Sequence, residues 1–353
     1  MTYARLSKYE ESVIKEKSKV KWMEAGNSNT NFFYNSLKER RSRNNILVLN
    51  SRENVRLEED REIGAECVEF YKTLFGIPSN NKGASAVIDG LQFDKLVSLE
   101  DSEKLLLPVT RDEVIEDLAS IHSSKAHGPD GFKFAFSKAL RPSLGMILFS
   151  ELKSVSFYLW RSIQDNILLA HEIVRNYHKS ISSPRCALKI DLHKAFDSVS
   201  WGAIVAVMKK FGLPKKLIDW IYICISTAKF SVMINGSPYG YFGAERGLRQ
   251  GCPLSPYLFV MVMEVFSGLL QQQVSSGNYG LHPKCRATNL TYLCFADDVL
   301  VFFKGNVQSA QVLARVMTDF SNFSGLSVNC DKTSLFSSAV NPNDLEVILT
   351  CLK

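Results

Sequence analysis

Two adjacent carboxylates, Asp297 and Asp298, stand in the middle of an apolar and aromatic run that extends from Tyr292 to Phe303. The apolar residues on either side predict two strands joined by a tight hairpin, with residues 296–298 at its tip. Like charges repel and are costly to desolvate at such a tip, whereas a bound divalent cation removes that cost. An ordinary solvated turn is the alternative, because Asp-Asp alone is a common pair.

A third carboxylate, Asp191, ends another short apolar run, residues 185–191. The end of one strand and the tip of a hairpin can meet at one edge of a sheet, so we expect Asp191 and Asp297 to lie together there. Oxygen ligands without histidine or cysteine suit Mg²⁺. Two such ions can activate a hydroxyl and stabilise the leaving oxygen of an in-line phosphoryl transfer. The carboxylates therefore point to that chemistry.

The segments before Asp191 predict two amphipathic helices. The first covers residues 55–76 and ends near Phe75. The second covers residues 161–178, with one apolar stripe facing inward. That stripe consists of Ile163, Ile167, Ala170, Val174 and Tyr177.

The segments after Asp191 predict helices that alternate with strands. Ser200 caps a helix that ends at Gly212, and residues 215–226 form the next. Asn235-Gly236 then predicts a hairpin turn. A loop rich in glycine and proline opens a long apolar helix, and a further helix covers residues 308–323. Strands separated by helices predict an α+β fold in which helices cover a mixed or antiparallel sheet.

Composition sets only broad limits on function. The 353-residue chain is 46% hydrophobic and carries a net charge of +6, which mildly favours a polyanionic partner. Its eight cysteines form no C-x-x-C pair, which indicates reduced cysteines in an intracellular protein without a zinc site. No apolar run approaches the ~18 residues of a membrane span, and the N-terminus lacks the apolar core of a secretory signal.

Three stretches together carry a family resemblance: IDLHKAFDSV at residues 190–199, GLRQGCPLSP at residues 247–256, and FADD at residues 295–298. In this order they resemble reverse transcriptases, and they look most like those of plant non-LTR (LINE-type) retrotransposons. Weaker stretches agree, namely residues 22–33, 125–132, 161–168 and 325–332. A group II intron maturase or a telomerase-like protein fits less well, because residues 22–33 look specific to LINE elements.

The resemblance implies roles for the residues near the carboxylates. Asp191 and Asp297 would be the ligands of two Mg²⁺ ions, for which Mn²⁺ can substitute, with Asp298 in support. Leu192 would offer its backbone carbonyl to the second ion. Lys332 matches the lysine proposed to protonate the leaving pyrophosphate.

The resemblance also implies a nucleotide-binding set. Phe196 matches the aromatic steric gate that excludes a 2′-hydroxyl, although a core phenylalanine is an equally good interpretation of the sequence alone. Arg249, Gln250 and Gly251 match the loop that lies against the incoming nucleotide and the template. Asp197 fits a structural role in a turn or helix cap better than a catalytic one.

The family pattern is interrupted between the Gly-Pro-Asp-Gly turn at residues 128–131 and residue 161. Reverse transcriptases of this type carry a longer fingers region there, with a Phe-Arg-Pro motif whose arginine clamps the triphosphate. This chain has only residues 133–160 in that interval and contains no Phe-Arg-Pro. We therefore expect a helical, partly basic extension with a linker over residues 1–92, a reduced fingers remnant over 93–160, and a palm over 161–353, with no thumb before Lys353.

These observations predict an RNA-directed DNA polymerase of a LINE-type retrotransposon. Its expected partners are an RNA template, a DNA primer and deoxynucleoside triphosphates, with no membrane, and nuclear action follows from the resemblance. The alternative is an impaired remnant or mis-spliced product that keeps the palm and non-specific nucleic-acid binding. Because the clamp and thumb are missing, we expect primer extension to be very weak or absent.

Overall fold

The computed structural model describes residues 30–76, 84–93, 96–106, 163–179, 183–250, 252, 254–295 and 298–352. The chain divides into two compact units. The first contains the residues before Leu74 together with Lys229–Phe242, and the second contains Leu74–Ala228 and Gly243–Lys353. The boundaries expected at residues 92 and 160 stay predictions.

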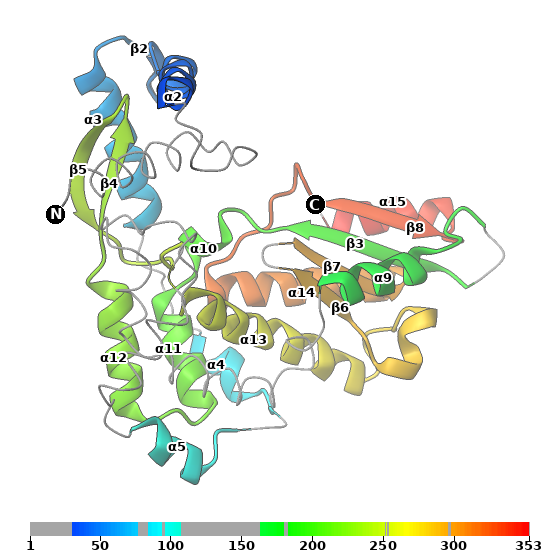
Figure 1. Cartoon of the computed structure of the whole chain (residues 1–353). Helices are drawn as coiled ribbons and strands as arrows, with labels where there is room; N and C mark the ends of the chain where they lie inside the picture. The colour runs from blue at the N-terminus through cyan, green and yellow to red at the C-terminus, as the bar shows by residue number, and fades with distance from the viewer. Residues whose placement is uncertain are drawn as a thin grey trace. The chain divides into compact units, whose positions relative to one another are not determined.

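The first unit combines an N-terminal segment with a hairpin from later in the chain (Figure 1). Its elements are α2 (Thr30–Asn44), β1 (Leu49–Asn50), β2 (Arg56–Leu57), most of α3 (Asp60–Phe75), β4 (Lys229–Ile234) and β5 (Ser237–Gly243). Asn235 and Gly236 make the predicted turn with positive φ angles of 50° and 88°. The helix expected from residue 55 begins at Asp60 instead, because β2 pairs with β1 before it.

The second unit is built on a four-stranded antiparallel sheet in the order β6-β7-β3-β8. The strands are β6 (Tyr292–Phe295), β7 (Asp298–Lys304), β3 (Arg185–Asp191) and β8 (Ser334–Ser338). The expected α+β palm with an antiparallel sheet is confirmed.

One face of the sheet packs on the main core. Alternate residues of β3 and β7 point into it, so Ile190 and Val299 are buried there. Helices α13 (Ser255–Ser275) and α14 (Val307–Ser324) lie along this face and α11 (Trp201–Lys210) packs on α13 (Figure 1). By length and composition α13 could cross a membrane, but eleven of its residues are buried in the protein, so it is the central helix of this core.

The opposite face is only partly covered. Helix α9 (Ile163–Val174) and the 3₁₀ helix η1 (Pro283–Thr288) enclose a smaller cluster around Ala187 and Phe302. The predicted inward stripe of α9 is wrong in part, since Ile167 is 52% exposed and Ile173 is buried. The run from Ile167 to Ala170 is apolar all round, so periodicity alone could not choose the buried side.

Short helices complete the second unit: α4 (Ala84–Asp89), α5 (Leu99–Leu105), α10 (Ala195–Ser198), α12 (Lys215–Ser226) and α15 (Pro342–Cys351). The predicted cap is confirmed, because Ser200 Oγ accepts a hydrogen bond from the Ala203 N–H. All eight cysteines are free, and Cys186 and Cys285 are buried.

A buried polar cluster joins α9 to η1 at the covered end of the sheet. His282 is fully buried, its Nδ1 accepts from the Lys284 N–H, and its Nε2 lies 2.9 Å from Tyr177 Oη. Nε2 therefore carries the proton of the neutral ring and donates it to Tyr177. Burial, together with the positive charges of Arg185 and Lys284, lowers the pKa of His282 to about 4.

We expect this histidine to make folding stability depend on pH. As pH falls below 6.5, the unfolded chain protonates His282 while the folded chain does not, so the free energy of unfolding decreases until about pH 4. The full effect is roughly 3 kcal/mol. His282→Gln keeps a donor for Tyr177 without the titration, so its denaturation curves should lack this part of the pH dependence. Equal pH dependence in both proteins would contradict the prediction.

Candidate active site

Two carboxylates meet at the uncovered end of the sheet. Asp191 is the last residue of β3 and Asp298 the first of β7, and the two are direct cross-strand partners. Directly opposite residues of an antiparallel pair point to the same face, here the one that α9 only partly covers. Asp298 was expected at the hairpin tip but begins a strand, because Phe295 pairs with it. Asp297 lies outside the described residues.

A loop after α14 holds Asp191 in place. The Asn329 N–H donates to the Asp191 carbonyl over 2.8 Å, and Asn329 Nδ2 donates to Asp191 Oδ2 over 3.1 Å. Thr333 Oγ1 donates to the Asn329 carbonyl over 2.8 Å, which closes the loop on itself. Asn329 and Thr333 were not predicted as site residues, although Asn329 lies in one of the stretches that carry the family resemblance.

Two lysines stand beside the carboxylates. Lys332 Nζ is 4.0 Å from Asp191 Oδ2, and the role expected for Lys332 stays a prediction. Lys189 Nζ is 3.2 Å from Asp298 Oδ1, and sequence reasoning missed it. The strand expected over residues 185–191 puts Lys189 on the same face as Asp191, but no local signal shows its partner, which comes from a strand far along the chain.

The segment after Asp191 is fastened on one side by the glycine-rich loop. The Gly247 N–H donates to the Val199 carbonyl and the Leu248 N–H to the Phe196 carbonyl. Gly247 has a φ of +89°, and a Cβ there would lie 2.7 Å from the Asp197 carbonyl oxygen. Only glycine fits this conformation and this approach.

The same segment is fastened on its other side by the end of α14. Gly325 has a φ of +77°, and a Cβ there would lie 2.9 Å from the Ser198 carbonyl oxygen. The Ser200 N–H donates to the Ser324 carbonyl, and the His193 N–H donates to the Ser327 carbonyl. Three stretches far apart in sequence therefore form one hydrogen-bonded unit around Asp191.

The expected nucleotide-binding residues lie on this unit. Phe196 is half-buried and stacks on Phe259, with ring centroids 5.0 Å apart, so it is at least partly a packing residue. The Gln250 side chain hydrogen-bonds to Asp197, whose pKa burial raises and this bond lowers. The Arg249 carbonyl accepts from Ser255 Oγ.

Two further residues were expected to contact the second ion or the nucleotide. Leu192 bridges to Val328 and its side chain is buried. Gly251 lies outside the described residues.

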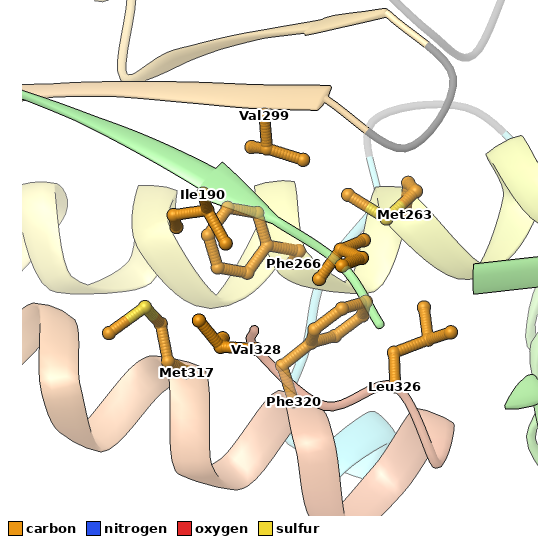
Figure 2. Close-up of a pocket in the computed structure, with 9 residues that line it drawn as sticks. Ile190, Met263, Phe266, Val299, Met317, Phe320, Leu326 and Val328 are labelled. Carbon is orange, nitrogen blue, oxygen red and sulfur yellow. The ribbon is translucent and has the colours of Figure 1, made fainter. Parts of the chain in front are cut away.

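A small apolar pocket lies beneath the carboxylates, on the core side of the sheet. Figure 2 shows Ile190 and Val299 on one side of it, and side chains of α13 and α14 on the other. Its cavity volume is about 20 Å³, room for about one water molecule. The lining consists of Ile190, Leu192, Met263, Phe266, Val299, Met317, Phe320, Leu326 and Val328. All of these side chains are apolar, so the pocket adds no charged group to the site.

The donor chemistry of this sheet end fits a divalent cation. Asp191 and Asp298 present carboxylate oxygens on one face, and oxygen donors suit Mg²⁺ or Mn²⁺. Within the described ranges, no group of three His, Cys, Asp or Glu side chains gathers as a metal site. Asp191 and Asp298 can supply two of the expected carboxylate ligands.

Comparisons with known proteins agree with this geometry. The model of the family "Reverse transcriptase (RNA-dependent DNA polymerase)" matches residues 136–344. A Pol polyprotein of the retrotransposable element R2DM of Drosophila melanogaster is 33% identical over 170 residues, which are 48% of this chain and 15% of that protein. A 149 kDa protein of transposon TX1 of Xenopus laevis is 24% identical over 335 residues, which are 76% of this chain and 25% of that protein. The chain thus spans a quarter or less of these two relatives.

Among solved structures, a truncated apo telomerase of Candida tropicalis aligns with a TM-score of 0.41 and 15% identity, over 57% of this chain and 40% of that one. The family model covers more than half of the chain and includes Asp191, the loop at Gly247 and Asp298. The chain therefore belongs to the reverse transcriptase family.

Proposed function

We propose that this chain catalyses RNA-directed DNA synthesis in a non-LTR, LINE-type retrotransposon. The observation that carries the proposal is the cross-strand pairing of Asp191 with Asp298 on an exposed sheet face, inside the matched family region. The relatives from R2DM and TX1 support the type of element. A plant source rests on the sequence resemblance alone.

In this proposal each residue near the site has one role. Asp191 and Asp297 hold the cations, and Asp298 supports them. When bound there, two divalent cations would supply activation of the primer hydroxyl and charge stabilisation of the leaving pyrophosphate. Lys332 donates a proton to that pyrophosphate. Asn329 fixes the Asp191 carboxylate by its hydrogen bond of 3.1 Å.

In this proposal the nucleotide is held by the glycine-rich loop that begins at Gly247 and by the segment after Asp191 to which that loop is hydrogen-bonded. Gln250 contacts the nucleotide, and its hydrogen bond to Asp197 limits the orientations of its amide. Phe196 limits the space at the sugar, and its stacking on Phe259 supports the ring.

The second candidate is a catalytically impaired remnant of such an enzyme. The absence of Phe-Arg-Pro favours it, because this motif supplies the arginine that clamps the triphosphate in related enzymes. The alignment with the TX1 protein extends over 335 positions but covers only 76% of the 353 residues of this chain, so it contains gaps on the side of this chain. Such gaps support a segment that is missing from this chain. Losing the positive charge of such an arginine beside the transferring phosphates lowers the reaction rate by orders of magnitude.

Primer extension on an RNA template tests both candidates. We expect weak extension of a DNA primer on homopolymer RNA with Mg²⁺ or Mn²⁺, and none by Asp297→Ala. Salt-sensitive binding without sequence preference should accompany it. Binding without extension would favour the remnant. Extension that survives Asp297→Ala would show that another site is responsible.

A further inference from the structure

Lys189 occupies an unusual place on the sheet. It lies in β3 two residues before Asp191, so both side chains point to the same face. Its direct cross-strand partner is Leu300, and its ammonium reaches diagonally to Asp298 over 3.2 Å. Lys189, Asp191 and Asp298 therefore share one end of one sheet face, and Lys332 approaches Asp191 from the loop before β8.

The coverage of this face changes along β3. At Ala187 the face is buried under α9 and η1, whereas the side chain of Lys189 is 48% exposed. Lys189 is thus the first residue of the strand beyond the apolar cover, between that cover and Asp191. Its ammonium is therefore accessible to solvent beside the carboxylates.

The two carboxylates differ in how they are held. Asp191 is 24% exposed, and Asn329 fixes one of its oxygens. Asp298 is 53% exposed, and its carboxylate forms an ion pair with Lys189. An exposed ion pair of this kind is weak, so a divalent cation can replace it.

From these observations we propose that Lys189 is a displaceable counter-ion of Asp298, which opposes binding of a divalent cation and, once displaced, binds a backbone phosphate of the primer–template duplex. This inference rests on the proposed function, because it takes Asp298 as part of the cation site. The ammonium and the cation compete for the same carboxylate, so removing the lysine strengthens cation binding. The freed ammonium stays beside the site and adds one phosphate contact.

Cation titration of the full chain without nucleic acid tests the first half. Mn²⁺ serves as the probe, since its free form is measured directly by electron spin resonance. Lys189→Gln should bind Mn²⁺ about two- to fivefold more tightly than the wild type, the range expected for losing an exposed pair. Lys189→Arg keeps the charge and should stay close to wild type. Lys209→Gln removes an exposed charge from α11 and should also have no effect.

Salt titration of duplex binding with Mg²⁺ present tests the second half. Lys189→Gln should reduce the slope of log K against log salt by about one, and Lys189→Arg should not. Unchanged or weaker Mn²⁺ binding by Lys189→Gln would overturn the inference. An unchanged salt slope would overturn the phosphate contact.

Two further variants separate this inference from the proposed function. If Asp191→Asn and Asp298→Asn weaken Mn²⁺ binding but Lys189→Gln leaves it unchanged, the inference about Lys189 fails and the proposed site stands. If neither aspartate variant changes Mn²⁺ binding, the proposed cation site itself is wrong.

Discussion

Replacing Asp191 with asparagine is expected to lower nucleotide addition by about a hundred- to a thousandfold, the loss typical when one preorganised electrostatic group is removed from an active site. The amide has nearly the same shape as the carboxylate, and its oxygen can still accept from Asn329. The fold should therefore survive while the charge that holds the cation is lost. Rates of primer extension with Mn²⁺ measure the effect, and thermal unfolding checks the fold.

Asp219→Asn is the matched control for this substitution. Asp219 is exposed on α12, so the variant loses the same charge away from the site and should extend primers like the wild type. If wild-type extension is too weak to quantify, loss of Mn²⁺ binding by Asp191→Asn is the readout. Wild-type rates in Asp191→Asn would exclude Asp191 from the reaction.

Replacing Gly247 with alanine is expected to destabilise the second unit by roughly 3 kcal/mol, the upper end of the cost of a strained backbone conformation. Strain at a φ of +89° is one cause, and the contact between the new Cβ and the Asp197 carbonyl is the other. The Gly247 N–H is bonded to the Val199 carbonyl, and the next N–H of the loop is bonded to the Phe196 carbonyl. The loop and the segment that contains Asp197 therefore cannot move apart without breaking these hydrogen bonds. Chemical denaturation measures the loss.

Gly277 provides the control that separates these two causes. It also has a positive φ, 73°, but a Cβ there would meet no atom within 4 Å. Gly277→Ala should therefore cost only about 1 kcal/mol, from strain alone. Equal losses in the two variants would show that the contact with Asp197 contributes nothing.

Local signals predicted much of the fold. The helix expected over residues 215–226 is α12, as observed, and Ser200 marked where α11 begins. The strand ending in Asp191 was also correct. Each of these elements is specified by residues within a few positions of its ends.

The missed features depend on long-range pairing. Strand β8 begins with Ser334 and contains three serines among five residues, so its sequence carries little strand signal until it pairs with β3. The ion pair of Lys189 and the hydrogen bonds of Asn329 likewise join segments distant in sequence. The family resemblance located the aspartates, but it could not supply these neighbours.

The position of β3 has a consequence for local opening of the sheet. β3 is paired along its length with β7 and over Arg185–Lys189 with β8, whereas β6 is a four-residue strand at the sheet edge. Amide groups of a doubly paired strand exchange only through large openings, and those of a short edge strand through small ones. Asp191 lies two residues beyond the last pair of β3 with β8 and is held there by Asn329, whereas Asp298 begins a strand whose other neighbour opens readily. The alignment of the two carboxylates can therefore be lost at a lower free energy than the fold itself.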